Sequence, residues 1–328
     1  MTGRFPFTAI VVTGLGLSAS PALGQILGEH YLAGTEGIQA GTLPGPGIYF
    51  DDINWFGHLS EAPGPGLNGE ISSYVNEPRL RWITPLKLLG AEYGMELMLP
   101  WGYQQYQLTQ ATSFPLAPGP KPPILGFYYH YGQYELHDLE VSPLLLSWHW
   151  NHFDLTAGYA FWAPTSDNSI LAIHPTDLNP SAYAPPAQFH WWEHMLTLGG
   201  TWHPDAAKLW AVSALNHYEI SQSFDSPIGV TTPGQLFTTE WGVSRVAGKY
   251  FEFGMVGNYS HQTTPTRIEP YYPESYTSST FELGPEIKVK VPQCDFSASL
   301  RYLREMKNPD SSGDYDLNVI VLSLSKRF

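Results

Sequence analysis

The chain has 328 residues, a net charge of −14, 14% charged residues and 14% aromatic residues. Its negative charge disfavours nucleic acid as a partner, because phosphate groups bind basic surfaces. Soluble domains carry roughly 25% charged residues, so this composition is typical of a protein with an apolar outer wall. The only cysteine is Cys294, so no disulfide within the chain is expected to stabilise the fold.

The first residues have the pattern of an export signal. Arg4 precedes an apolar stretch over residues 7–17, and Ala22, Leu23 and Gly24 form a small-residue cleavage pattern. We therefore expect residues 1–24 to be a signal peptide that directs the chain out of the cytoplasm. No run of about 18 apolar residues follows, so no transmembrane helix is expected.

Residues 25–46 precede the first expected strand and are too numerous for a simple tail. They include Gly34, Gly37, Gly41 and Gly45 and show little periodicity. Because glycine lets the backbone turn within a narrow space, one interpretation is a segment that folds into a lumen. The other interpretation is a disordered leader in the periplasm.

Residues 47–328 alternate between apolar residues and polar or small ones. Between residues 90 and 104, for example, Met95 and Leu97 alternate with Glu92 and Glu96. Period two indicates β-strands, and runs of about 10 to 17 residues exceed the five or six that are typical of soluble sheets. Aromatic residues also cluster near the strand ends, as they do where a membrane barrel meets the bilayer interfaces. These residues are Trp101, Tyr103, Trp148, Trp150, Tyr159 and Phe161.

Twelve strands are expected, an even number as in single-chain bacterial barrels. They span residues 47–59, 71–85, 90–107, 136–150, 153–165, 191–203, 208–223, 235–248, 250–263, 277–292, 295–308 and 314–328. Short connectors alternate with long ones near residues 60–70, 109–135, 166–190, 224–234, 264–276 and 309–313. This alternation predicts short periplasmic turns and long extracellular loops. The predicted fold is thus an all-β transmembrane outer-membrane barrel of about twelve antiparallel strands over residues 47–328, with both termini in the periplasm.

Charged residues on the polar phase of several strands are predicted to face the lumen. An Arg or Lys that faces lipid at the bilayer midplane costs about 2–4 kcal/mol, which favours the inward orientation. The candidates are Glu77, Arg79, Arg81, Glu92, Glu96, Glu282, Glu286, Lys288, Lys290 and Arg301. They are interpreted either as a salt-bridge ladder that fills the barrel or as residues that contact a permeating solute.

The chain ends in Phe328, which Ile320, Leu322 and Leu324 precede on the same strand face, although Lys326 interrupts that face. Outer-membrane barrels commonly end in an aromatic residue that the assembly machinery recognises. We therefore predict Phe328 as the assembly signal and the barrel-assembly machinery as a partner.

Several short motifs resemble those of the outer-membrane proteins described as transporters of the phenol meta-degradation pathway. They are HYLAGTEGIQAGTLPGPGIY at residues 30–49, DLEVSPLLLSW at 138–148, APT at 163–165 and LGPEI at 283–287. Gly45 interrupts the family's proline run, and Ser166 replaces a glycine in its Pro-Thr-Gly turn. The resemblance spans nearly the whole mature chain. It implies a barrel related to the fatty-acid and toluene channels, which carry hydrophobic molecules through the outer membrane.

In the related fatty-acid channels an N-terminal segment plugs the lumen, so the resemblance favours this role for residues 25–46. His30 and Tyr31 are the plug candidates, and we expect them to meet inward carboxylates such as Glu92 or Glu286.

Two patterns raise the alternative of an enzyme. HWWEH at residues 190–194 matches a zinc pattern that needs both histidines on one helix face. Its context indicates a strand, in which the two histidines lie about 13 Å apart, so interfacial aromatic residues are favoured over a metal site. The chain contains no G-x-S-x-G motif, so a lipase-type Ser-His pair has no support from neighbouring residues.

The sequence predicts a monomeric outer-membrane channel for passive uptake of small hydrophobic, aromatic compounds. Its expected partners are outer-membrane lipid and lipopolysaccharide, the barrel-assembly machinery and the solute. No catalytic residue, metal or cofactor is expected. The alternatives are a barrel enzyme of the lipase or deacylase type and a structural or adhesive barrel.

Overall fold

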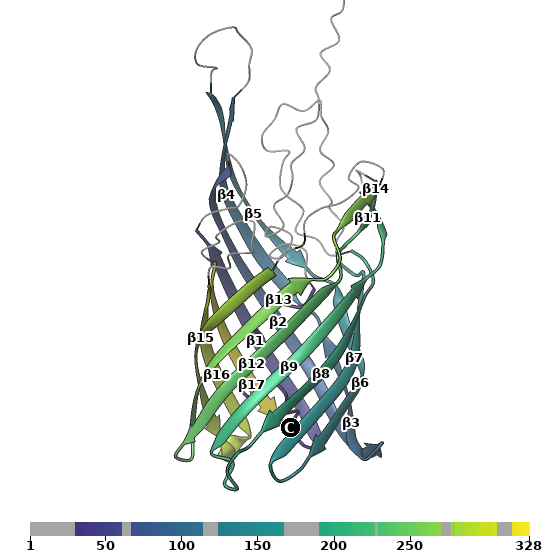
Figure 1. Cartoon of the computed structure of the whole chain (residues 1–328), viewed down its shortest axis with the longest axis vertical. Helices are drawn as coiled ribbons and strands as arrows, with labels where there is room; N and C mark the ends of the chain where they lie inside the picture. Colours follow the sequence, from purple (N-terminus) through teal and green to yellow (C-terminus); the bar gives the residue numbers. More distant parts are fainter. Residues whose placement is uncertain are drawn as a thin grey trace, which may run out of the picture.

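The computed structural model describes residues 30–60, 67–113, 124–166, 190–226, 229–269, 277, 279–306 and 317–328. The expected signal peptide, residues 1–24, lies outside these described residues. Within them, no helix is both long enough and apolar enough to cross a membrane. β-Strands make up most of the described part of the chain (Figure 1).

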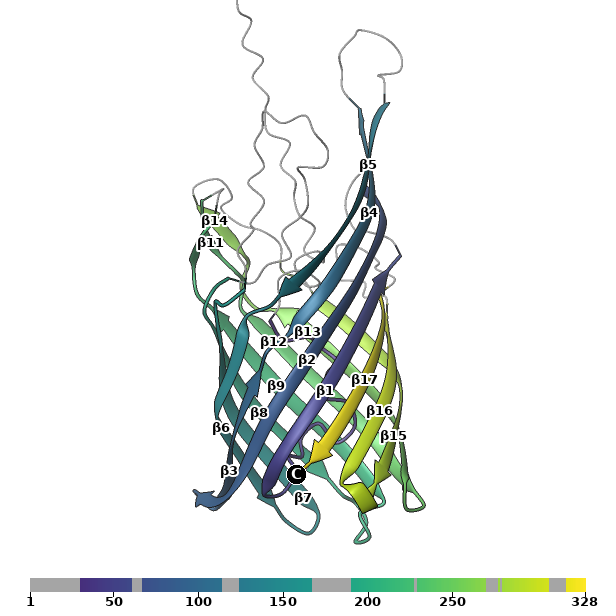
Figure 2. The same ribbon diagram turned by 180° about the vertical axis from the view of Figure 1, so that it is seen from behind.

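Fourteen strand segments form one antiparallel sheet that closes into a barrel (Figure 1). They are β1 (Gly47–Leu59), β2 (Leu67–Leu88), β3 (Ala91–Met98), β4 (Trp101–Ser113), β5 (Ile124–Leu136), β6 (Leu139–His149), β7 (Phe153–Ala163), β8 (Glu193–Trp202), β9 (Trp210–Ser221), β12 (Leu236–Ala247), β13 (Phe251–Gln262), β15 (Ser279–Val291), β16 (Phe296–Glu305) and β17 (Leu317–Arg327). The first strand, β1, pairs with both β2 and β17, which closes the wall (Figure 2). Because β3 with β4 and β5 with β6 each form one interrupted strand, the segments described here make twelve barrel strands. The predicted number and antiparallel arrangement are confirmed.

The strand expected over residues 90–107 is interrupted between β3 and β4. Pro100 lies in the gap and has no N–H group to donate to a neighbouring strand. The Leu99 N–H donates instead to the Pro78 carbonyl at 3.3 Å, and the His137 N–H donates to the Pro100 carbonyl at 2.9 Å. The adjacent strand is also interrupted at the same height, between β5 and β6.

The prediction of a long loop over residues 109–135 is wrong. Instead β4 continues to Ser113, β5 begins at Ile124, and the two strands pair along their whole length. This hairpin rises above the rest of the barrel (Figure 1). A strand outside the membrane needs no apolar face, so the period-two signal fades there although the strands continue.

Three shorter strands lie within segments that were expected to be irregular loops. They are β10 (Phe224–Ser226), β11 (Gly229–Thr232) and β14 (Arg267–Glu269), which form a separate three-stranded sheet. This small sheet stands at the end of the barrel that carries the long connections (Figure 1).

The outer wall carries a broad band of exposed apolar side chains. It includes Ile48, Phe56, Leu80, Trp82, Met95, Leu97, Leu196, Leu198, Val243, Phe253, Met255, Leu300, Ile320 and Leu322. Their neighbours along each strand are buried or half-buried, as in β9, where exposed and buried residues alternate from Trp210 onward. An apolar exterior of this kind suits hydrocarbon as the surrounding solvent.

The short connections all lie at one end of the barrel. They are residues 89–90, 150–152, 203–209, 248–250 and 292–295. The same end carries Gly47 at the start of β1 and Phe328 at the chain terminus, whose N–H donates to the Ile48 carbonyl at 2.9 Å (Figure 2). Short turns mark the periplasmic end of outer-membrane barrels, so we call this the periplasmic end and its opposite the extracellular end.

Candidate functional site

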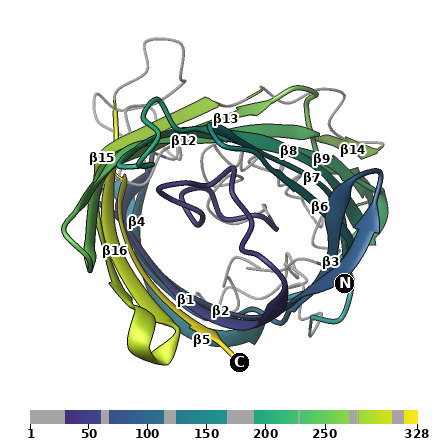
Figure 3. The same cartoon turned by 90° about the horizontal axis from the view of Figure 1, so that it is seen from below.

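The described part of the N-terminal segment, residues 30–46, lies inside the barrel (Figure 3). Thr42 donates to Asp154, near the periplasmic start of β7, at 3.1 Å. At the other end, His30 lies 3.2 Å from Glu193, at the extracellular start of β8. The segment therefore extends along the lumen between the two ends of the barrel.

Glu240 of β12 holds the middle of this segment. Its carboxylate accepts hydrogen bonds from the backbone N–H groups of residues 34–37, at 2.9 to 3.4 Å. It also accepts one from the Tyr31 hydroxyl at 2.5 Å. Successive backbone N–H groups that converge on one anion form a nest, here closed around a buried side chain of the barrel wall.

His30 and Tyr31 meet inward carboxylates as expected, but their partners are Asp138, Glu193 and Glu240 rather than the two named examples. Glu92 forms an ion pair within the barrel wall instead, and Glu286 accepts the backbone N–H of Ile38 at 2.9 Å. Both carboxylates face the lumen as predicted, but they lie at other heights along it. The pairing depends on how deeply the segment enters the barrel, and strand periodicity carries no such information.

Two of the predicted inward arginines also bind the segment. Arg79 of β2 forms an ion pair with Glu36, and Arg301 of β16 donates to the Gly34 carbonyl at 2.8 Å. Both arginines are buried. They therefore compensate the acidic lumen and position the segment at the same time.

The segment presses directly on the backbone of β8 near the periplasmic end. A Cβ added to Gly41 would lie 2.4 Å from three backbone atoms of Gly200, and the Cα of Gly41 lies 3.2 Å from the position of a Cβ on Gly199. Only glycine at these positions permits so close an approach.

The other predicted inward residues form ion pairs along the wall. Arg81 lies 2.5 Å from Glu96 and 3.7 Å from Asp51, and Lys290 lies 2.8 Å from Glu252. Glu77 forms an ion pair with Arg79, and Arg301 forms one with Glu286. The Glu282 carboxylate accepts a hydrogen bond from the Asn258 amide, and Lys288 is half-buried on β15. The structure thus places all ten on the luminal side, several of them in a ladder of ion pairs.

His30 occupies an enclosed site at the extracellular end. Its ring stacks on Trp162 with centroids 5.4 Å apart, and Trp191 meets it edge-on at 5.0 Å. Its Nε2 lies 3.0 Å from Asp138 and its Nδ1 lies 3.2 Å from Glu193. We call Trp162, Trp191, Asp138 and Glu193 the His30 cage.

The buried charged groups around His30 and Glu36 determine the protonation states of these two residues of the segment. Burial would lower the pKa of His30, but Glu193 and Asp138 outweigh it and raise that pKa to about 9. Desolvation would raise the pKa of Glu36, but Arg79 outweighs it and lowers that pKa to about 2. At neutral pH the segment therefore presents an imidazolium to two carboxylates and a carboxylate to an arginine.

An apolar patch on the luminal wall was not predicted from the sequence. It comprises Ile38 of the segment with Ile53, Trp55, Leu59, Ile71, Val75, Val256, Leu303, Leu317, Val319 and Val321, all buried. The signal was present in β17, where LNVIVLSL places apolar residues on both strand faces. Strict alternation would have predicted a polar lumen on this side.

The carboxylates that anchor the segment were not predicted either. Glu240, Glu193 and Asp138 lie on inward positions, and the polar phase of their strands could have identified Glu240 and Glu193. Asp138 lies at the interruption between β5 and β6, where the alternation is lost.

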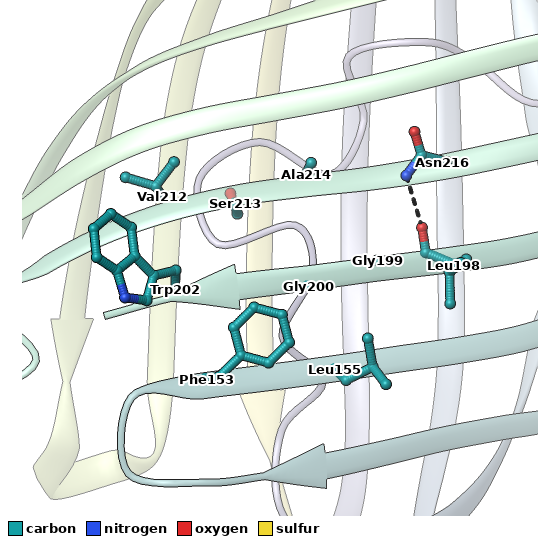
Figure 4. Close-up of a pocket in the computed structure, with 10 residues that line it drawn as sticks. All are labelled: Phe153, Leu155, Leu198, Gly199, Gly200, Trp202, Val212, Ser213, Ala214 and Asn216. Carbon is teal, nitrogen blue, oxygen red and sulfur yellow. Dashed lines mark hydrogen bonds between the residues drawn. The ribbon is translucent and has the colours of Figure 1, made fainter. Parts of the chain in front are cut away.

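A hollow on the outer face of the barrel wall lies opposite the N-terminal segment, which is on the inner face. It holds about 310 Å³ and is lined by Phe153, Leu155, Leu198, Gly199, Gly200, Trp202, Val212, Ser213, Ala214 and Asn216 (Figure 4). Figure 4 shows its bulky side chains at the rim and the two glycines between them, with the N-terminal segment behind that part of the wall. The lining is almost wholly apolar, as a lipid-facing surface requires.

The HWWEH pattern does not form a helix. Glu193 and His194 are consecutive residues of β8 and point to opposite faces of the wall. Among the residues that the structure describes, no group of three or more His, Cys, Asp or Glu side chains is arranged to hold a metal ion.

Comparison with known proteins supports the fold. An outer membrane channel from Pseudomonas putida F1 is similar over 92% of this chain and 100% of that one, with a TM-score of 0.62 and 12% identity. Weaker likenesses include the β domain of the Bordetella autotransporter BrkA (TM-score 0.48, 8% identity, 86% and 100% covered) and a mutant of the TodX monoaromatic hydrocarbon channel (0.42, 10%, 87% and 91%). No curated protein matches the chain in sequence. The fold is that of a transmembrane outer-membrane β-barrel, as predicted.

The sequence itself matches a family profile over residues 56–313, which is most of the barrel. The match covers β2 to β16 and the luminal residues that they carry. The resemblance predicted from short motifs is thereby confirmed. The chain belongs to the family described as "Putative MetA-pathway of phenol degradation".

Proposed function

We propose that the protein is a channel of the bacterial outer membrane for passive uptake of small hydrophobic compounds, aromatic ones among them. The observation that carries this proposal is the buried apolar patch on the luminal side of β1, β2 and β17. A wall of Ile, Val, Leu and Trp side chains receives an apolar solute without the desolvation cost that a fully charged lumen imposes.

The N-terminal segment is the gate of this channel. Residues 30–46 occupy the lumen through bonds to several strands, so a solute passes only when part of the segment moves. Each bond to a charged partner contributes about 1.5–3 kcal/mol. The segment is thus held firmly, but its contacts with the barrel wall are noncovalent and can be broken.

Membrane lipid, lipopolysaccharide and the barrel-assembly machinery are the partners that such a channel needs, and a monomer suffices because one chain closes the barrel. No described feature favours the lipase or deacylase alternative. An esterase assay on the purified protein keeps that alternative open to test.

The gate is tested by deleting residues 30–46 and by two matched substitutions. Gly37 has φ +69°, and an added Cβ would lie 2.2 Å from Glu286 Oε2, whereas nothing lies within 4 Å of a Cβ on Gly45. Gly37→Ala should therefore displace the segment and raise the conductance in planar bilayers, towards that of the deletion. Gly45→Ala should leave the conductance as in the unchanged protein.

Uptake in a strain that lacks the gene provides the functional measurement. The deletion and Gly37→Ala should speed entry of an apolar aromatic solute without an energy source. Equal uptake with and without the protein, or hydrolysis that a single Ser or His substitution abolishes, would contradict the proposal.

A further inference from the structure

The surroundings of His30 form a complete ligand-binding site. The imidazole lies at 30° to the plane of Trp162 and at 75° to that of Trp191. Its two nitrogens each reach a carboxylate, Asp138 at 3.0 Å and Glu193 at 3.2 Å. A flat ring with donors on its edge and aromatic faces around it is the arrangement by which proteins bind organic cations.

Both carboxylates are held in place by groups other than His30. Asp138 Oδ1 accepts the backbone N–H groups of residues 165–166, both at 2.8 Å. Glu193 Oε2 accepts the indole N–H of Trp191 at 3.2 Å and the Ser221 hydroxyl. The oxygens that face His30 therefore keep their orientation when the ring leaves, and the site is pre-organised.

The site requires a positive charge. Removal of the imidazolium would leave two buried carboxylates uncompensated, which is strongly unfavourable. The other titratable groups that face the site are Glu219 of β9, which hydrogen-bonds to Glu193, and His137, which lies between β5 and β6. Accordingly, burial would lower the pKa of His30, but the two carboxylates outweigh it and raise that pKa to about 9.

The geometry points to the His30 cage as a binding site for a small planar aromatic cation with N–H donors, which His30 fills as an internal ligand. An external ring of this class, such as imidazolium or aminopyridinium, takes the place of His30. The end of the segment at His30 then leaves the cage and the gate opens. This inference adds a ligand that triggers opening to the proposed function; the trigger rests on that function, whereas the binding site does not.

The site is tested on purified, detergent-solubilised protein with His30→Gly, after a heat shift on a gel has shown that the barrel is folded. Imidazole is titrated by calorimetry near pH 6, below the pKa of about 6.5 of a histidine side chain, so that most of it is protonated. We expect binding at least tenfold tighter than to the unchanged protein, in which the internal ligand competes. Phenol and toluene, which bring no charge, should bind at least tenfold more weakly than imidazole.

His217→Gly provides the matched control. His217 is also buried and packs on an aromatic ring, Tyr31, at 4.1 Å, but its Nδ1 lies 3.0 Å from the Thr197 hydroxyl, whereas both nitrogens of His30 lie within 3.2 Å of a carboxylate. Imidazole should bind this variant no better than the unchanged protein. Adding Glu193→Gln to His30→Gly should weaken imidazole binding at least tenfold.

Equal imidazole affinity in the two glycine variants, or a preference of His30→Gly for phenol, would overturn the site. If His30→Gly does not fold, the unchanged protein serves instead. Imidazole should then increase amide hydrogen exchange of residues 30–37 saturably, and no increase would overturn the inference.

The trigger and the channel are tested separately from the site by measuring conductance. Tight binding without a rise in conductance overturns the trigger alone. Conductance that stays low even after deletion of residues 30–46 contradicts the channel, whereas the imidazole affinity measured by calorimetry still decides whether the site exists.

Discussion

Glu240 is the residue on which the position of the N-terminal segment depends most. Its carboxylate is buried and binds residues 34–37 and the Tyr31 hydroxyl. Glu240→Ala should therefore destabilise docking of the segment by about 3 kcal/mol and raise its undocked fraction roughly a hundredfold. Single-channel recording should show this as frequent openings in a channel that is otherwise mostly closed.

Glu140→Ala is the matched control for that substitution. Glu140 is likewise a buried luminal glutamate, but its carboxylate accepts a hydrogen bond from Ser142 on its own strand, at 2.9 Å. The control should keep the openings rare. Frequent openings in both variants would mean that any lost luminal carboxylate disturbs the barrel, and that Glu240 has no special part in docking.

His30 makes docking of the segment dependent on pH. Its pKa rises from about 6.5 in the undocked segment to about 9 in the cage, because Glu193 and Asp138 outweigh burial. A raised pKa stabilises docking fully below about pH 6.5, and the effect is lost as the pH rises through about 9. The shift corresponds to about 3 kcal/mol. Conductance should therefore rise between about pH 7 and 10.

The control for this pH dependence is His30→Gln, which keeps an amide donor but does not titrate in this range. Its conductance should be flat over the same interval. Glu219 and His137 also face the site, so a pH response that persists in His30→Gln would assign the effect to them rather than to His30.

At the scale of single elements, different residues of β17 are expected to serve the stability of the folded barrel and its assembly. The side chain of Phe328 is 76% exposed, whereas Val319 and Val321 on the inward face of β17 are fully buried. Loss of Phe328 therefore costs the folded barrel little packing. Phe328→Ser should nevertheless lower the yield of assembled barrel severalfold, because we propose that the assembly machinery reads this residue.

The melting temperature of the assembled fraction distinguishes the two effects. It should stay within a few degrees of that of the unchanged protein, since surface changes usually alter stability by less than about 0.5 kcal/mol. Ile320→Ala removes another exposed side chain of β17 and should leave the yield unchanged. A matching fall in yield for Ile320→Ala would refute a specific role for the terminal residue.

The interruptions between β3 and β4 and between β5 and β6 show where the strands depart from what the local sequence predicts. Residues 90–104 were correctly predicted to alternate, but the interruption at Pro100 lies beside a second one, where the His137 N–H donates to the Pro100 carbonyl. Nothing in the sequence near His137 requires that second interruption. Only the pairing in the barrel shows it, because β2, on the other side of Pro100, continues without a break.

For the whole molecule, the proposed orientation in the membrane places Cys294 on the periplasmic side. Cys294 is exposed in the short turn between β15 and β16, at the same end as Phe328. A maleimide carried on a large polymer should therefore label it only after the outer membrane has been permeabilised. The converse variant, Asp225→Cys in a Cys294→Ser background, exposes its thiol in β10 at the extracellular end and should react in intact cells. The reverse pattern would invert the proposed topology.

The sequence by itself determined the fold class, the number of strands and the luminal side of the ten charged candidates. Each of these follows from local alternation, because successive side chains of a strand point to opposite faces and only one face meets lipid. For the same reason, alternation fails as a predictor where no contact with lipid requires it. It did not predict the strands of the β4–β5 hairpin outside the membrane or the apolar residues on the inner face of β17.

Only the tertiary structure decided which luminal side chains meet. Tyr31 and Glu240 are 209 residues apart, and His30 and Asp138 are 108 apart. Their contact depends on the closure of the barrel, on the tilt and stagger of its strands, and on how deeply the N-terminal segment enters the lumen. Alternation determines which way each residue faces, but a shared lumen lets any inward residue meet several others. The final pairing is set by the packing of the whole chain.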